Sequence, residues 1–106
     1  MIDMKFYPIP KNVNIMNVLL MAYVSNYDIK NIYPPTKEGK KLSYLHNGKF
    51  INFGSKYYDS YDNHLDKNRR EAYLKRATNI KGNWKKDKYS PNNLSINLLW
   101  SKKINL

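Results

Sequence analysis

The sequence predicts a small α+β domain, in which a β-hairpin packs on a basic helix and a short C-terminal helix. Three observations support this fold class: an Asn-Gly pair between two alternating runs, an Asp before a helical pattern, and a Ser-Pro start before a second apolar helix. A length of 106 residues suits a single domain, which typically has about 100–150. With 14% aromatic residues, the chain has the material for one small core and is not a disordered tail.

Charge divides the chain into two parts. Residues 1–36 are apolar and nearly neutral, whereas most of the basic residues follow Pro35. Because the Pro34-Pro35 pair interrupts regular structure, we predict a boundary there. Residues 1–36 are then an N-terminal appendage, helical or extended, and residues 37–106 form the basic α+β module.

Two elements are expected within the appendage. A proline confines residues 4–9 to an edge strand or to a non-strand segment. Asn12 is expected to cap a helix over Val13–Val24, whose apolar side chains recur at helical spacing. This helix is shorter than the roughly 20 apolar residues that span a bilayer, so we expect it to be a core element.

The module is expected to begin with a hairpin. Residues 41–45 and 49–53 alternate in polarity on either side of Asn47-Gly48, and this dipeptide is the strongest short hairpin signal. Gly54 is expected to end the second strand.

Two helices are expected after the hairpin. Asp66 is the predicted N-cap of a basic helix over residues 67–78. Ser90 is the predicted N-cap of a short apolar helix that begins at Pro91, because Ser and Pro favour these two positions. Residues 79–89 between the two helices are expected to form a loop.

The balance of charges points to an anionic partner. The chain has 19 Lys and Arg against 8 Asp and Glu, a net charge of +11, which favours nucleic acid, an anionic membrane surface or an acidic protein. The absence of cysteine excludes disulfides, thiolate zinc sites and cysteine nucleophiles. No basic stretch precedes an apolar run at the N-terminus, so we expect a protein that is not secreted.

Non-specific binding of nucleic acid through its phosphates is the function that we expect first. The candidate phosphate contacts lie on the predicted basic helix and in the loop after it: Lys67, Arg69, Arg70, Lys75, Arg76, Lys81, Lys85, Lys86 and Lys88. Aromatic side chains beside lysines are candidates for stacking on unpaired bases, namely Tyr57, Tyr58 and Trp84. The alternative is a solvated helix face, with Trp84 and Trp100 in the core. DNA and RNA, single- or double-stranded, all remain open as targets.

A different pattern in residues 59–66 leads to a third hypothesis, a metal-dependent nuclease. Asp59, Asp62, His64 and Asp66 are spaced closely, and carboxylates with a histidine bind hard divalent ions. Each has a structural explanation as well, since Asp is common in turns and Asp66 is the predicted helix cap. We therefore expect a protein that is not an enzyme and that has no catalytic residues, cofactor or metal site.

Several short motifs of the module follow one another in a fixed order. They are Phe53-Gly54-Ser55-Lys56, then His64-Leu65-Asp66, Arg69-Arg70 with Tyr73, Trp84, and finally Leu98-Leu99-Trp100. Over about residues 40–101 this order resembles an uncharacterised family of short basic proteins of large nucleocytoplasmic DNA viruses. Ala77 stands where that family often has a histidine, and residues 1–36 have no counterpart. The resemblance implies a viral protein of the virion, host cytoplasm or viral factory, and it implies no mechanism.

A viral origin adds a structural alternative to nucleic-acid packaging. A small basic protein of a large virus can serve as a minor capsid or cement protein that docks between larger virion proteins. The apolar N-terminal third is then the docking arm, and its candidate anchors are Phe6, Tyr7, Ile9, Leu19, Leu20 and Tyr23.

Overall fold

The computed structural model describes residues 5–106 as a three-stranded antiparallel sheet with four α-helices, which confirms the α+β fold class. In chain order the elements are α1 (Ile15–Val24), the 3₁₀ turn η1 (Ile29–Asn31), β1 (Ile32–Tyr33), β2 (Lys40–His46), β3 (Lys49–Ser55), α2 (Tyr61–His64), α3 (Lys67–Thr78), the 3₁₀ turn η2 (Trp84–Lys86) and α4 (Pro91–Leu98). Among the described helices, none is both long and apolar enough to cross a membrane.

The predicted hairpin of β2 and β3 forms, but β3 continues through Gly54 to Ser55 instead of ending at Gly54. His46 pairs with Lys49, so the connection is the two-residue loop Asn47-Gly48. Both loop residues have positive φ, 50° and 75°, as a type I′ turn requires. This turn matches the right-handed twist of the strands and sets their register.

The third strand is β1, which pairs with β2 on the side away from β3. The segment predicted as an edge strand, residues 4–9, has no strand over residues 5–9, and residue 4 lies outside the described residues. This segment packs against the sheet without pairing with it: Tyr7 N donates to Pro35 O at 2.8 Å, and Phe6 contacts the rings of Tyr33 and Phe50. A two-residue strand such as β1 is too short to show alternation, so the sequence alone did not reveal it.

α1 belongs to the same core as the hairpin and does not extend from the domain as an appendage. Its residues Val18, Met21 and Ala22 are fully buried in one cluster with residues of β2, β3 and α4. The predicted core role of this helix is confirmed, whereas the described part of the predicted appendage, residues 5–36, does not form a separate unit. The helix begins later than predicted, because Asn14 accepts the capping bond from Asn17 N at 3.1 Å.

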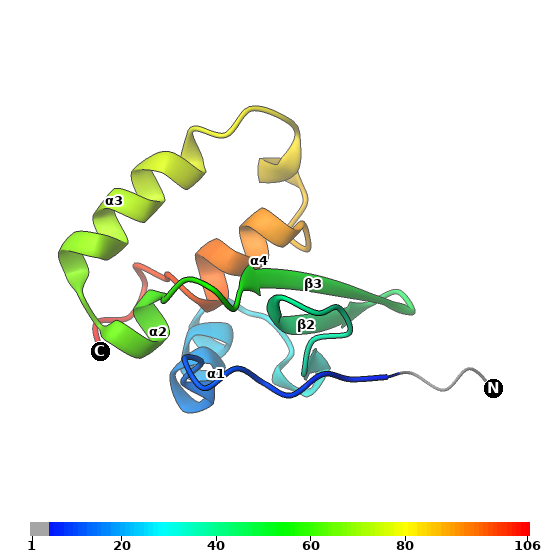
Figure 1. Ribbon diagram of the computed structural model, residues 1–106. Coiled ribbons are helices and arrows are strands. Elements are labelled where there is room, and N and C mark those ends of the chain that lie inside the picture. The colour runs from blue at the N-terminus through cyan, green and yellow to red at the C-terminus, as the bar shows by residue number, and fades with distance from the viewer. Residues whose placement is uncertain (1–4) are drawn as a thin grey trace.

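α3 and α4 follow their predicted caps. Asp66 accepts from the backbone N–H groups of Asn68 and Arg69, and Ser90 accepts from that of Asn93. α4 packs between β3 and α1, so this helix rather than α3 covers the hairpin. α3 projects away from the sheet, and the chain returns from its end through η2 to α4 (Figure 1).

Candidate functional site

A cleft of about 950 Å³ lies between α3, the start of α4 and the ends of β2 and β3. Its wall is aromatic, with Tyr58, Tyr73, Trp84 and Trp100. Three exposed cations, Lys40, Arg69 and Arg76, stand at the rim, whereas Lys41 and Ser60 are buried at the base. The cleft therefore combines apolar walls with a positively charged entrance.

The aromatic wall is held rigidly on two sides. Tyr73 stacks on Trp100, with ring centroids 4.1 Å apart and planes inclined by 9°. Trp84 is half-buried, and its indole Nε1–H donates to Ile80 O at 2.7 Å. The η2 turn that carries Trp84 is tied to α4, because Asn93 Nδ2 donates to Trp84 O at 2.8 Å.

Two of the three predicted stacking residues line this cleft. Tyr58 and Trp84 face it, whereas Tyr57 does not line it, although its side chain is also exposed. Trp100 belongs to the core cluster, as the alternative interpretation of the tryptophans predicts. Trp84 lies outside that cluster, so its position suits a binding wall better than a core.

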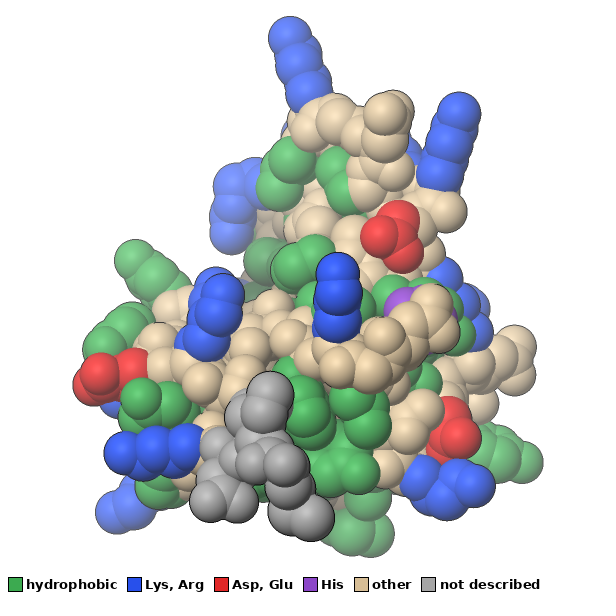
Figure 2. All heavy atoms as spheres, turned by 90° about the vertical axis from the view of Figure 1, so that its right-hand side faces the viewer, with side chains coloured by type: hydrophobic (Ala, Val, Ile, Leu, Met, Phe, Trp, Pro, Cys, Tyr) green, Lys and Arg blue, Asp and Glu red, His purple; other side chains and the backbone are tan. Residues whose placement is uncertain are grey.

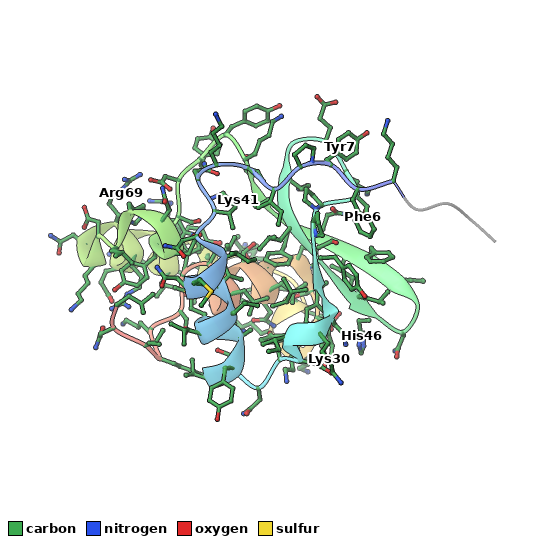
Figure 3. The ribbon with its side chains drawn as sticks, turned by 90° about the horizontal axis from the view of Figure 1, so that it is seen from below. Phe6, Tyr7, Lys30, Lys41, His46 and Arg69 are labelled. Carbon is green, nitrogen blue, oxygen red and sulfur yellow. The ribbon has the colours of Figure 1, made fainter. Side chains whose placement is uncertain are left out.

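Arg69 and Arg76 are the predicted phosphate contacts that reach the cleft. They lie seven residues apart on one face of α3. Arg69 lies on α3 at the periphery of the molecule (Figure 3). Among the described residues that line the cleft, the one acidic residue is Asp59. Among residues 5–106, the only ion pair joins Lys102 Nζ to Glu71 Oε2 at 3.0 Å, so neither rim arginine is neutralised by a carboxylate.

Arg70 is a correction to the predicted phosphate contacts, because only 5% of it is exposed. Its guanidinium donates to the backbone oxygens of Ser101 and Ile104 and lies over the ring of Tyr61 at 4.4 Å. Arg70 follows Arg69 on the helix and is therefore turned by about 100°, toward the C-terminal segment. It holds that segment on α3 and is not available to a ligand.

Lys88 is exposed but is also engaged within the protein. Its Nζ donates to Asn26 O at 2.6 Å and lies 4.7 Å from the ring centre of Tyr27. This contact fastens the loop before α4 to the end of α1. Lys88 therefore has a structural role in addition to its charge.

The other predicted cations are exposed and lie outside the cleft: Lys67, Lys75, Lys81, Lys85 and Lys86. Basic side chains also project from well-separated places on the face that carries the hairpin tip, where acidic ones are few (Figure 2). The positive charge is thus spread over the molecule, and at the rim of the cleft it lies beside an aromatic wall.

A buried polar chain that sequence reasoning missed lies under the cleft. Lys41 Nζ donates to Ser60 Oγ at 2.6 Å, and Ser60 Oγ donates in turn to Asp62 Oδ1. Asp62 Oδ2 accepts from Asn14 N at 2.8 Å. The side chains of Lys41, Ser60 and Asp62 are each at most 2% exposed. Lys41 lies in the interior of the molecule (Figure 3).

Burial is the largest influence on the pKa values of Lys41 and Asp62. It lowers the pKa of Lys41, and the carboxylate of Asp62 opposes that shift. It also raises the pKa of Asp62, against the hydrogen bonds from Ser60 and Asn14. Both groups are therefore drawn toward their neutral forms, and each partly offsets the cost of burying the other.

The acidic residues of the nuclease hypothesis do not converge. Among residues 5–106, no three His, Cys, Asp or Glu side chains lie close enough to hold a metal ion. Asp62 belongs to the buried chain, and Asp66 caps α3. His64 Nδ1 accepts from Asp66 N at 2.9 Å, and burial lowers its pKa. Asp59 accepts from Ser60 N and from Asn63 Nδ2.

Comparison with known proteins adds one similarity. Residues 30–77 match the model of a family of unknown function, DUF5754. The matched segment runs from η1 to the last turn of α3, so it includes the buried chain and the two rim arginines and excludes Trp84 and α4. Searches of curated proteins and of solved structures gave no match.

Proposed function

We propose that the protein binds nucleic acid with low sequence specificity, through contacts of its cations with phosphates. The observation that carries this proposal is the pair Arg69 and Arg76, exposed and not neutralised at the rim of an aromatic cleft. A packaging or core-associated role in a virus is part of this proposal.

The charge distribution favours a polyanion over a small anion. A net charge of +11 on 106 residues creates a positive field around the whole molecule, which raises the rate of encounter with nucleic acid. Arg69 and Arg76 are separated by about 10 Å along the helix, so they reach different phosphates of one strand. Contacts to phosphates carry no sequence information of their own, so specificity is expected to be low.

The affinity is expected to fall steeply with salt. Each phosphate that a cation neutralises releases condensed counterions, so the logarithm of the association constant falls by about 0.9 per contact for each logarithmic unit of salt. Fluorescence anisotropy with labelled duplex, single-stranded DNA and RNA over a range of salt measures this slope. A flat salt response would contradict the proposal.

The rim arginines can be tested against cations elsewhere on the surface. The double variant Arg69→Gln/Arg76→Gln is expected to bind more weakly and to reduce the salt slope by about two, since two phosphate contacts are lost. The control Lys30→Gln/Lys103→Gln removes the same charge from exposed positions outside the cleft. Equal losses in the two variants would show that the rim has no special role.

A second candidate function is docking between larger virion proteins. Met16, Leu20 and Tyr23 lie on one face of α1 and are 66%, 45% and 76% exposed, and such apolar patches mark protein contacts. Deleting residues 1–36 is not a usable test, because it removes core residues of α1. The variant Leu20→Ser/Tyr23→Ser is expected to fold and to bind nucleic acid normally. If docking is the function, this variant is not incorporated into virus particles.

A further inference from the structure

We infer that the cleft receives unpaired bases of a single-stranded polynucleotide, while the rim arginines hold its phosphates. This inference rests on the proposed function and names the part of the nucleic acid that the cleft recognises. The chemistry is common to DNA and RNA, since the bases of both present flat aromatic faces.

The shape and lining of the cleft fit flat apolar groups. Its volume of about 950 Å³ lies within the range of roughly 300–1,000 Å³ that is typical of ligand sites. Beside the aromatic wall, the apolar side chains of Phe53, Ala72, Ile80, Pro91 and Leu99 line it. A double helix offers no base faces to such a wall, because its bases are stacked inside and show only their edges in the grooves.

Two aromatic side chains of the wall are available for stacking. Tyr58 is 75% exposed, so one of its faces is open. Trp84 is held in place by its indole N–H bond to Ile80 and by the bonds from Asn93 to its backbone. A stacking platform that is fixed in advance loses little conformational entropy on binding.

The charge around the cleft complements a single strand. Lys40, Arg69 and Arg76 are exposed beside the aromatic wall. Asp59 is the only acidic residue among the described ones that line the cleft, and one of its oxygens already accepts from Ser60 N at 3.0 Å and from Asn63 Nδ2 at 2.9 Å. Alternation of cations with aromatic faces is the arrangement by which proteins bind single strands without reading their sequence.

Tryptophan fluorescence is a direct probe of this cleft. The chain has two tryptophans, Trp84 and Trp100, and both line the cleft. Titration with oligothymidylate and with oligouridylate is expected to quench this fluorescence, because bases stack on or beside the indoles. A duplex with the same number of phosphates is expected to quench less and to bind more weakly.

Adjacent tyrosines supply a matched pair of variants. Tyr58→Leu is expected to weaken single-strand binding by about 5- to 150-fold, the loss of one base stack, with little effect on duplex binding. Tyr57→Leu is the control, because Tyr57 is 71% exposed but does not line the cleft. Both side chains are at the surface, so both variants are expected to fold, as circular dichroism verifies.

The outcomes separate this inference from the proposed function. Equal binding of duplex and single strands without quenching, or equal losses in Tyr57→Leu and Tyr58→Leu, would overturn the inference and leave phosphate binding intact. No binding of any nucleic acid at low salt would overturn both. Quenching by one of the two homopolymers alone supports the inference and identifies DNA or RNA as the ligand.

Discussion

Replacing Asp62 with alanine is expected to lower the free energy of unfolding by about 3–5 kcal/mol, because it leaves the buried Lys41 without a compensating carboxylate. The Asp62 carboxylate accepts hydrogen bonds from Ser60 Oγ and from Asn14 N, and it lies near the buried Lys41. Without it, two donors lose their acceptor and the lysine loses its counter-charge. Because small domains are stable by about 5–15 kcal/mol, urea denaturation of the variant reports a large shift.

Two further variants identify the source of this loss. Asp62→Asn keeps the shape of the side chain and an acceptor oxygen, so it is expected to cost less than Asp62→Ala. In Lys41→Met/Asp62→Asn both charges are removed together, and such replacements of buried pairs are often neutral or stabilising. If Asp62→Ala cost no more than an exposed substitution such as Asn63→Ala, the buried chain would not stabilise the fold.

The same residue is expected to make stability depend on pH. Burial raises the pKa of Asp62 in the folded protein, so between its ordinary value of about 3.9 and the raised value the folded state binds more protons than the unfolded state. The part of the stability that arises from this pKa difference is therefore full below the ordinary value and is lost as the pH rises through the raised one. Denaturation of the native protein and of Asp62→Asn across this range measures the difference, which is expected to shrink as the pH rises.

Lys41 has the opposite pH dependence in the alkaline range. Burial lowers its pKa in the folded state, so below its ordinary value of about 10.4 and above the lowered value the unfolded state binds more protons. Stability from this group therefore rises with pH through that window. Lys41→Met is expected to remove this rise.

The elements that the sequence predicts well are those whose signals are local. In the Asn47-Gly48 turn and in the caps at Asp66 and Ser90, the interacting residues are at most three positions apart in the sequence. Their geometry therefore follows from short-range chemistry. The N-cap of α1 is the exception, because two asparagines compete near its start. Asn12 instead donates to Lys56 O, a contact 44 residues away that no local pattern reveals.

The candidate site is predictable only in part, for the same reason. Interleaved cations and aromatics identify Arg69, Arg76, Tyr58 and Trp84, all of which line the cleft. The burial of Arg70 depends on the C-terminal segment, 31 residues further along the chain.

The buried lysine of β2 departs from the simple strand pattern. Lys41, Leu42, Ser43 and Tyr44 are consecutive and all buried, because neighbouring elements cover both faces of this central strand. Alternation assumes that one face meets solvent, so it fails in such a strand. The pairing of Lys41 with Ser60 joins residues 19 apart and carries no local signal.

Replacing Gly54 with alanine is expected to destabilise the fold by about 2–5 kcal/mol, through backbone strain and close contact together. The φ of Gly54 is +76°, and an added Cβ would lie 2.8 Å from Leu99 Cδ1 and 3.1 Å from Lys41 Cβ. Leu99 is only 1% exposed, so it has little room to move. A shift of Lys41 would in turn disturb its hydrogen bond to Ser60 at the base of the cleft.

Gly48→Ala separates the two causes. Gly48 has nearly the same φ, +75°, but an added Cβ there meets nothing within 4 Å. This control is therefore expected to lose only the strain energy, about 1–2 kcal/mol, and to keep its affinity for single strands. The excess loss in Gly54→Ala then measures the contact with Leu99 and Lys41. If urea denaturation showed the same loss of unfolding free energy in both variants, the packing around Gly54 would adapt to a methyl group without cost. The close approach of Gly54 to Leu99 and Lys41 would then not be needed for the shape of the cleft.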